Sequence, residues 1–386
     1  MSAFDPAAFL PDDLLERIRE RAPIHDREHT FPQQDLDELR AAGYLAILVP
    51  ADRGGAGLGL AEAAILQQRL ASAAPATALA INMHLVWTGV AKVFSDRGVP
   101  GLEFVQDGAV AGEVFAFGIS EGGNDLVLFG SDTDAVPTAD GGYTFTGTKI
   151  FTSLAPVWTK LGLHGLDTTS ADAPKLVFAF VERTDAVVTG DDWDTLGMRA
   201  TQSRTTRLSG AAAAAEHVVR RIDPGPNPDP IVFGIFSVFE VLLASVYTGL
   251  ARRALDLAVE TAHRRRSKST GAAYSQDPDI RWRIADMGLA YDALPPQIRA
   301  LARDVDERVD HGARWFTLLS GLKHRAITTA KQVVDEAMLV AGGGSYFSSN
   351  ELSRLYRDVL AGAFHPSDPE SAHATAASAW LGPRET

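Results

Sequence analysis

A segment with four prolines in seven residues, Pro224-Gly225-Pro226-Asn227-Pro228-Asp229-Pro230, divides the chain. Because proline fixes φ and has no N–H to donate, this segment can form neither the interior of a helix nor a central strand. Before it, from Glu113 to Asp223, Thr, Val, Phe and Gly alternate as they do in strands. After it, apolar residues recur at helical spacing, as they also do in the first 112 residues. The pattern predicts a helical domain at 1–112, a β-domain at 113–223 and a second helical domain at 230–386.

The helical pattern after the prolines predicts four long helices with short connections, near residues 231–266, 279–310, 313–341 and 350–364. Such helices pack as a bundle. In the β-domain, Thr138 to Gly147 predicts a hairpin turn that leads into a strand, and Lys175 to Val181 predicts a buried strand. For the apolar run from Leu45 to Pro50 we expect an extended conformation. The predicted fold class is α+β, mainly α: an N-terminal helical domain, a small central β-domain and a C-terminal four-helix bundle.

Composition excludes several classes of protein. The formal net charge of −13 disfavours nucleic acid and anionic membrane surfaces as partners. The chain has no cysteine, and no His and carboxylate pair has ligand spacing on a convincing helix, so we expect no metal site. No basic segment followed by an apolar run marks a signal peptide. The longest apolar stretch, Ile231 to Tyr247, is interrupted by Gly234 and Glu240 and is too short to span a bilayer. We expect a soluble, cytoplasmic protein.

The most specific motif lies near the C-terminus. A glycine-rich turn, Gly342-Gly343-Gly344-Ser345-Tyr346, precedes the run Glu351-Leu352-Ser353-Arg354-Leu355-Tyr356-Arg357-Asp358. These two segments resemble the C-terminal signature of the acyl-CoA dehydrogenase superfamily. Further segments resemble that superfamily in the same order along the chain: Val49-Pro50 with Gly54 to Gly57, Gly118 to Asp125 with Gly147 to Ser153, and Leu196 to Thr201, which matches a late strand of the β-domain. The resemblance covers nearly the whole chain and implies a flavin-dependent oxidoreductase, a homotetramer, with FAD between the β-domain and the bundle.

The resemblance also implies a set of cofactor-binding residues. Ser120 and Ser153 match the positions whose hydroxyls contact the flavin ring, although hydroxyls at strand ends also satisfy the local backbone. Arg266 matches an arginine that grips the flavin pyrophosphate of a neighbouring subunit, a task that suits the guanidinium fork. A solvated helix C-terminus is the alternative for Arg266. Gly342 and Gly343 match the glycine pair that lies near the same adenine and pyrophosphate region.

Two departures from the family pattern leave FMN, or reduced flavin supplied by a reductase, as alternatives to FAD. The segment after Glu121 lacks the small polar residue that reaches the flavin phosphates, and Ser131 could replace it if the loop is longer. The glutamine that is common three residues before the glycine pair is Leu339 here.

Most family members carry their catalytic glutamate eight residues after the aspartate of the signature, where this chain has Pro366. Proline offers neither a carboxylate nor an N–H, so it cannot supply the base and the backbone donor of α,β-dehydrogenation. Glu240 is near the place where some relatives carry the base, but it is one residue out of register, a rotation of roughly 100° on a helix. It could instead cap the first turn of its helix. The first hypothesis is an enzyme that oxidises an acyl-CoA or similar substrate at CH–CH, with Glu240 as base and an electron-transfer flavoprotein as partner.

His365 supports a second hypothesis. A minority branch of the superfamily has a similar run from Arg-Asp to a histidine at this position, and its members are monooxygenases that take reduced flavin from a flavin reductase and use O2. In that branch His365, His84 and Ser153 line the site, and imidazole suits proton transfer because its pKa is near neutral. The alternatives are a satisfied histidine in an apolar helix for His84 and the cap of a helix end for His365. A non-catalytic flavin-binding relative is the third hypothesis.

Overall fold

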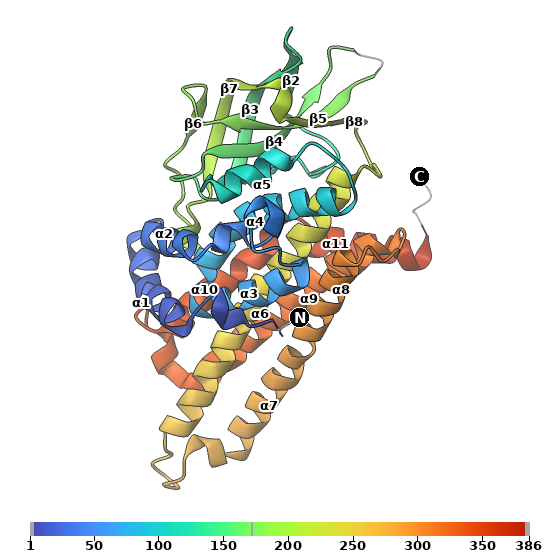
Figure 1. Cartoon of the computed structure of the whole chain (residues 1–386). Helices are drawn as coiled ribbons and strands as arrows, with labels where there is room; N and C mark the ends of the chain where they lie inside the picture. Colours follow the sequence, from blue (N-terminus) through green and yellow to red (C-terminus); the bar gives the residue numbers. More distant parts are fainter. Residues whose placement is uncertain (1–3, 171–172, 383–386) are drawn as a thin grey trace.

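The computed structural model describes residues 4–170 and 173–382, in which helices, strands and helices follow one another in the predicted order (Figure 1). The N-terminal helices are α1 (Asp12–Glu28), α2 (Gln33–Ala41), α3 (Leu60–Ala73), α4 (Pro75–Asp96) and α5 (Glu103–Val110). The strands are β1 (Phe115–Gly118), β2 (Asp134–Pro137), β3 (Tyr143–Thr152), β4 (Lys160–Asp167), β5 (Lys175–Glu182), β6 (Val187–Thr189), β7 (Arg204–Ala213) and β8 (Val218–Ile222). The proline-rich segment connects β8 to the C-terminal helices.

The C-terminal helices are α6 (Pro230–Arg264), α7 (Pro278–Asp292), α8 (Leu294–Asp306), α9 (Arg314–Ala341), α10 (Glu351–Leu360) and α11 (Pro369–Leu381). Short 3-10 turns that matter below are η2 (Tyr44–Ala46), η4 (Arg199–Thr201), η7 (Gly342–Tyr346) and η8 (Ala361–Phe364).

The strands form one sheet in the order β6-β7-β3-β2-β4-β5-β8, and β1 pairs with β4 in parallel. The predicted hairpin is β2–β3, in which Pro137 pairs with Tyr143 across the turn. The predicted buried strand at 175–181 is β5. Because β1 lies against α4 as well as β4, the residues that follow β1 emerge where the sheet meets the helices (Figure 1).

The long helix α6 is the centre of the helical part. It packs against α3, α4 and α9, and a Cβ on Gly249 would lie only 2.2 Å from the Gln68 carbonyl oxygen of α3, so the two backbones approach closely. By length and composition α6 could cross a membrane, contrary to our expectation from its interruptions. However, 89% of its most apolar 18-residue window is buried inside the molecule. It is therefore a core helix.

The C-terminal part differs from the predicted four helices in two places. The predicted helix at 279–310 is two helices, because Pro295 and Pro296 begin α8. Proline fits the first turn of a helix but interrupts one that continues through it. The helix α11 was not predicted, although Asp368-Pro369 is a helix-start signal: the Asp368 carboxylate accepts the backbone N–H of Ser371 at 2.8 Å.

The apolar run from Leu45 to Pro50 is not extended, so that expectation was wrong. Its first residues belong to η2, and the glycine-rich loop that follows folds back over the run. The backbone N–H of Gly57 donates to the Val49 carbonyl at 2.8 Å, and a Cβ on Gly55 would lie 2.2 Å from that oxygen. A short apolar segment is typical of any buried backbone, whether it is a strand or an irregular segment. Composition alone therefore could not distinguish the two conformations.

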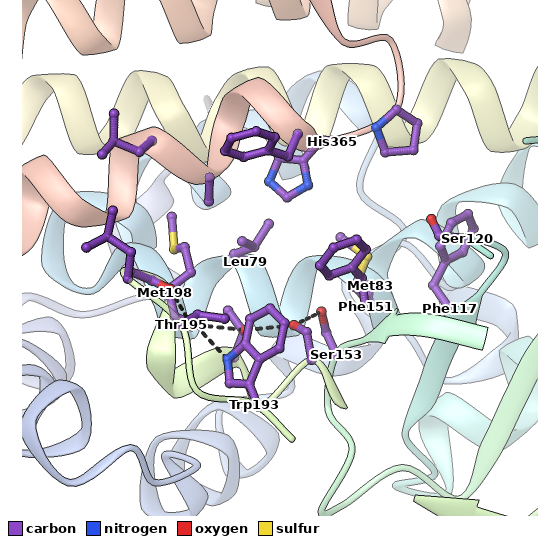
Figure 2. Close-up of a pocket in the computed structure, with 18 of the residues that line it drawn as sticks. Leu79, Met83, Phe117, Ser120, Phe151, Ser153, Trp193, Thr195, Met198 and His365 are labelled. Carbon is purple, nitrogen blue, oxygen red and sulfur yellow. Dashed lines mark hydrogen bonds between the residues drawn. The ribbon is translucent and has the colours of Figure 1, made fainter. Parts of the chain in front are cut away.

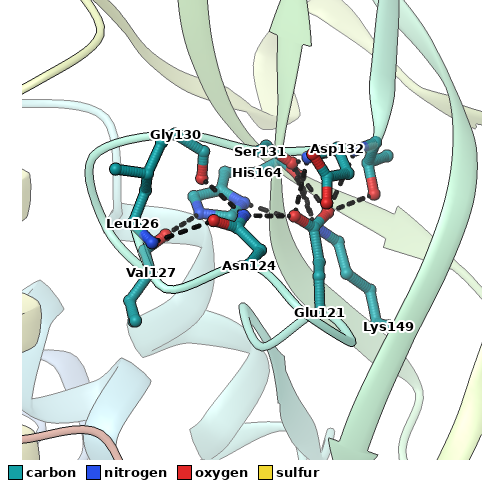
Figure 3. A network of polar contacts seen from close by, with 10 residues as sticks. Glu121, Asn124, Leu126, Val127, Gly130, Ser131, Asp132, Lys149 and His164 are labelled. Atoms are coloured by element: carbon teal, nitrogen blue, oxygen red, sulfur yellow. Dashed lines mark hydrogen bonds and ion pairs between the residues drawn. The ribbon is translucent and has the colours of Figure 1, made fainter.

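A buried ion pair holds the loop between β1 and β2 (Figure 3). Lys149 Nζ donates to Glu121 Oε1 at 2.6 Å, and both side chains are buried. The same carboxylate accepts the backbone N–H groups of Asp132 and Thr133 at 2.7 and 3.1 Å, and the Ser131 hydroxyl at 2.8 Å. Burial alone would raise the pKa of Glu121, but the Lys149 charge and these hydrogen bonds hold it far below its usual value.

We expect this pair to be sensitive to the loss of one partner. A Lys149→Met variant leaves Glu121 buried without its cation, so the free energy of unfolding should fall by about 3–5 kcal/mol. The variant Lys149→Met/Glu121→Gln removes both charges, so its free energy of unfolding should fall by less than that of Lys149→Met. Urea denaturation of the two variants measures the difference, and equal losses would contradict a role for the charge.

His84 on α4 joins the N-terminal helices to the sheet. The ring is fully buried; its Nδ1 accepts the backbone N–H of Phe115 at 3.1 Å, and its Nε2 lies 2.8 Å from the Leu45 carbonyl oxygen. Since a carbonyl only accepts, the proton of the neutral ring is on Nε2. Burial, aided by the charge of Arg40, lowers the pKa of His84 to about 4.

His84 should therefore make stability depend on pH. In the unfolded chain the ring takes a proton near pH 6.5, whereas in the folded chain it takes one only near pH 4, so its contribution is lost as the pH falls between these values. The difference in unfolding free energy between the wild-type protein and a His84→Gln variant should shrink by about 2 kcal/mol between pH 7 and pH 5. Urea denaturation at both pH values checks this, and a constant difference would refute a neutral buried ring.

Candidate functional site

A cavity of about 280 Å³ lies where the β-domain meets the segment that follows α10 (Figure 2). In Figure 2, His365 enters from the C-terminal segment, and Ser153 and Trp193 approach from the β-domain on the opposite side. The lining residues are Leu79, Met83, Phe117, Ser120, Phe151, Ser153, Trp193, Thr195, Leu196, Gly197, Met198, Thr201, Ser203, Phe239, Arg357, Leu360, Ala361, Phe364, His365 and Pro366.

The surface of this cavity is mostly apolar and aromatic. Phe151 and Trp193 lie edge to face, with ring centroids 6.1 Å apart. Of the described residues, no Asp or Glu lines the cavity, and its ionisable side chains are Arg357 and His365. Arg357 is already paired, because its Nη1 donates to Asp26 Oδ1 at 2.9 Å. The lining therefore presents hydrogen-bonding groups but no uncompensated charge.

The His365 imidazole is carried to the cavity by the turn after η8. Its Nε2 lies 2.8 Å from the Tyr247 hydroxyl of α6. Burial, together with the charge of Lys323, lowers the pKa of His365 to about 3, so the ring is neutral at pH 7. Tyr247 has no other hydrogen-bond partner in residues 4–170 and 173–382, and a proton donated to Nε2 satisfies both groups. We therefore assign the proton of the neutral ring to Nδ1.

Three hydroxyls form a row along the β-domain side of the cavity. Thr201 Oγ1 donates to the Met198 carbonyl at 2.8 Å, Ser203 Oγ lies 2.7 Å from Thr201 Oγ1, and Ser153 Oγ lies 2.7 Å from Ser203 Oγ. Because Thr201 uses its proton on Met198, Ser203 donates to Thr201, and Ser153 in turn donates to Ser203. The lone pairs of the Ser153 oxygen are thus left as an acceptor for the cavity.

Ser120 lies two residues after the end of β1, and its carbonyl accepts the backbone N–H of Ile150 at 2.9 Å. The buried pair of Glu121 and Lys149 fixes the next residue of the chain. The Ser120 hydroxyl has no hydrogen-bond partner among the described residues, and the side chain lines the cavity. The fold thus brings Ser120 to the same cavity as two other predicted residues, Ser153 and His365.

The structure gives Ser131, the alternative phosphate ligand if the loop is longer, a partner within the β-domain. Its hydroxyl donates to Glu121 at 2.8 Å, inside the β-domain, and the side chain does not line the cavity. The loop between β1 and β2 is organised around the carboxylate rather than around an open anion site (Figure 3).

Left-handed backbone is concentrated around the cavity. Among the residues that the structure describes, eight other than glycine have positive φ. Phe151 (56°) and Met198 (52°) line the cavity, and Leu154, Gln202 and Ser367 each follow or precede a lining residue. This conformation costs on the order of 1–3 kcal/mol per residue and persists only where the surroundings impose it. Such clustering is typical of a functional site.

The helix α10 imposes the conformation of one of these segments. The backbone N–H of Met198 donates to Asp358 Oδ1 at 2.6 Å, and a Cβ on Gly197 would lie 2.2 Å from the Arg357 carbonyl oxygen. Only glycine allows this approach. The segment at 196–201, for which the resemblance implied a strand, is therefore a loop ending in η4, and β7 begins after it.

Glu240 does not line the cavity. Its neighbour Phe239 does, so the difference of one residue turns the Glu240 carboxyl away and toward Lys323 of α9. Glu240 is 1% exposed, and its Oε2 has no hydrogen-bond partner in the part of the chain that the structure describes. It does not cap α6 either; Asp229 does, by accepting the backbone N–H of Ile231 at 2.8 Å.

The remaining predicted site residues also lie outside the lining. His84 is bonded to backbone on both nitrogens, as described above. Arg266 is exposed just beyond α6, and Gly342 and Gly343 lie just beyond α9. Arg265 joins these two ends by donating to a carbonyl of α9 at 2.5 Å. Contacts of Arg266 and the glycine pair with a flavin thus stay predictions about an assembly of more than one chain.

Several residues of the site were not predicted from the sequence. Trp193, which lines the cavity, stands alone among acidic residues in the loop 191–194, and this isolated aromatic ring was a usable signal. Tyr247, which contacts His365 from outside the lining, carries a hydroxyl inside an otherwise apolar helix, where it needs a partner. Ser203 and Thr201 gave no signal, because only the folded loop aligns them with Ser153. No three His, Asp or Glu side chains gather as metal ligands in the described ranges.

Two family models match the chain: the N-terminal domain of acyl-CoA dehydrogenase at residues 12–95 and its C-terminal domain at 241–367. Curated relatives differ in their named reactions. L-evernosamine nitrososynthase of a Micromonospora strain is 28% identical over 91% of this chain and 84% of its own. The putative acyl-CoA dehydrogenase YdbM of Bacillus subtilis is 27% identical over 95% and 94%. Dibenzothiophene monooxygenase of Rhodococcus qingshengii is 25% identical over 95% and 90%.

Among solved structures, KijD3 in complex with FMN and dTDP-3-amino-2,3,6-trideoxy-4-keto-3-methyl-D-glucose has a TM-score of 0.84 at 28% identity. The match covers 99% of this chain and 95% of that one. Sequence and fold agree along almost the full length, although the named reactions of the relatives differ. The chain belongs to the acyl-CoA dehydrogenase family.

Proposed function

We propose that this protein is a flavin-dependent monooxygenase that uses reduced flavin and O2. The observation that carries the proposal is the cavity lining, in which the neutral imidazole of His365 faces a row of hydroxyls and, of the residues described, no carboxylate takes part. Relatives named nitrososynthase and dibenzothiophene monooxygenase, at 28% and 25% identity, support an oxygenating branch of the family.

The same lining argues against α,β-dehydrogenation. That reaction needs a base for the α-proton and a donor for the developing enolate. Pro366 lines the cavity at the position where the family base is expected, and it supplies neither group. Glu240, the other candidate base, is turned toward Lys323 and is absent from the lining. We therefore do not assign the oxidation of an acyl-CoA at CH–CH to this chain.

The lining fits a flavin ring. Phe151 and Trp193 offer aromatic surface on the β-domain side, and Ser120 and Ser153 offer hydroxyls on the same side, so a flat ring with a polar edge meets suitable groups of both kinds. We infer that Ser120 and Ser153 hold that edge, with Ser153 as an acceptor. When bound, the reduced flavin supplies the electrons that activate O2 for transfer of one oxygen atom.

We propose FAD as the cofactor, with FMN as the alternative. Arg357 is committed to Asp26, so it does not supply a free cation for a pyrophosphate. The predicted phosphate ligand Arg266 lies beyond α6, away from the lining, and could reach a flavin only in a neighbouring subunit. A phosphate contact of Arg266 would therefore require the expected homotetramer. The proposed reaction also requires a flavin reductase as partner. We further propose a cytoplasmic location, and the burial of α6 inside the molecule is compatible with a soluble protein.

We propose His365 as the catalytic residue. Because Tyr247 donates to Nε2, the proton on Nδ1 remains for a hydrogen bond within the cavity. The low pKa of His365, caused by burial and by Lys323, keeps the ring neutral at pH 7. A neutral donor can hold a proton against a developing negative charge without bringing a permanent charge into apolar surroundings.

We further propose a neutral, largely apolar substrate. Leu79 and Met83 of α4 and Phe239 of α6 give the cavity apolar walls. A buried ammonium or phosphate group would need a counter-charge, and the guanidinium of Arg357 is already paired. A planar aromatic or heteroaromatic compound therefore fits this lining better than an acyl-CoA or an amino-sugar nucleotide.

Oxygen uptake tests the proposed reaction. The protein, supplied with FMN or FAD, a flavin reductase with NADH as its reductant, and indole as a neutral probe, should consume O2 and form an oxygenated product that mass spectrometry detects. An acyl-CoA thioester should not bleach the oxidised flavin under anaerobic conditions. Bleaching would contradict the proposal in favour of dehydrogenation. Flavin binding with neither oxygenation nor bleaching would favour the non-catalytic flavin-binding relative.

The role of His365 can be tested separately. The variant His365→Ala should lower the rate of oxygenation by about 10²–10⁴-fold, because it removes the proton held at the cavity. Flavin affinity, measured by fluorescence titration, should not change. As a matched control, Tyr247→Phe keeps the ring but removes the donor to Nε2, so a smaller loss is expected. A His365→Ala protein with the wild-type rate would refute this role.

A further inference from the structure

We propose that Lys323 is a positioning residue, whose ammonium holds the backbone turn at 365–367 and thereby the His365 imidazole at the cavity. The inference rests on the proposed role of His365. Neither Glu240 nor Lys323 lines the cavity, and both are buried in the layer behind it.

The contacts of Lys323 are directed at this turn alone. Its Nζ donates to the carbonyl oxygens of His365, Pro366 and Ser367 at 2.9, 2.8 and 2.9 Å. Lys323 is 1% exposed, so the three protons of the ammonium are all used within the protein. Hydrogen bonds to a charged group are stronger than those between neutral groups, so three of them together fix the backbone of this turn.

The turn has an unfavourable conformation that needs such support. Ser367 has φ of 57°, in the left-handed region that a serine seldom adopts. Pro366 has no N–H with which the turn could be closed by the backbone itself. Three successive carbonyls that converge on one cation replace the missing backbone bonds.

Three carbonyl oxygens explain how a buried ammonium is tolerated, because they replace its water. Burial lowers the pKa of Lys323, and the charges of Glu240 and Asp368 oppose that shift. Burial also raises the pKa of Glu240 to about 8, so the carbonyls rather than this carboxyl are the main partners of the ammonium. Apolar side chains could fill the same space without the desolvation cost of a charge, so a buried lysine here indicates a role beyond packing.

Lys323 and Tyr247 hold His365 from two sides. The lysine fixes the backbone of the residue, and the tyrosine hydroxyl fixes Nε2 of its ring. If the lysine is lost, the turn is free to move, and a displacement of a catalytic group by about 1 Å costs on the order of 10²-fold in rate.

The test compares Lys323→Met/Glu240→Gln with Lys331→Met in the full chain. The double variant leaves no buried charge unpaired. We expect its kcat for oxygenation to fall on the order of 10²-fold with unchanged flavin affinity. Lys331 lies on the same helix but is half-exposed and pairs with Asp335, so its variant should keep the wild-type kcat. In protein labelled with ¹⁵N-histidine, the His365 signal should change from one neutral tautomer to a mixture in the double variant only.

An unchanged His365 spectrum in the double variant would overturn the proposal. A changed spectrum with unchanged kcat would support the positioning by Lys323 and would instead overturn the catalytic role of His365. Should the double variant not fold, the wild-type protein still decides: the protons of the Lys323 ammonium should exchange with solvent far more slowly than those of Lys331, and equal exchange would refute the proposal.

Discussion

The site depends on the close contact between α10 and the loop before η4. Gly197 lets the loop backbone approach the Arg357 carbonyl, and the buried Asp358 carboxylate accepts the N–H of Met198. Burial raises the pKa of Asp358 to about 6, although that N–H favours its ionised form. Through this contact the β-domain is held against the segment that carries His365. The Arg-Asp pair of the C-terminal motif thus joins the two sides of the cavity.

The order of elements could be predicted because its signals are local. The four prolines between residues 224 and 230 separate a segment with the alternating pattern of strands from a segment with the apolar spacing of helices. This signal does not depend on contacts with the rest of the chain. The run from Leu45 to Pro50 was misread because its conformation depends on a later loop, whose Gly55 and Gly57 fold against Val49. The boundary between α7 and α8 has a local signal, because Pro295-Pro296 fits the first turn of a new helix and not the interior of a long one.

Site residues could be predicted from the sequence only where a motif indicates both the position of the residue and the side of the element to which its side chain points. Ser120, Ser153 and His365 lie at the ends of elements and meet at one cavity. His84 and Glu240 lie inside helices, where spacing does not reveal which neighbour satisfies them. The partners of His84 come from backbone 39 and 31 residues away along the chain, and Glu240 is turned by a single residue toward α9.

Two buried lysines stand behind opposite sides of the cavity. Lys149 pairs with Glu121, which directly follows Ser120, and Lys323 binds the carbonyl of His365. In both places the lysine and its partners lie one layer behind the lining, where they fix backbone, while the lining itself carries no uncompensated charge. A carboxylate in the cavity suits the removal of a proton from carbon. A lining without a carboxylate suits a neutral imidazole as hydrogen-bond donor, because no fixed anion competes for its proton.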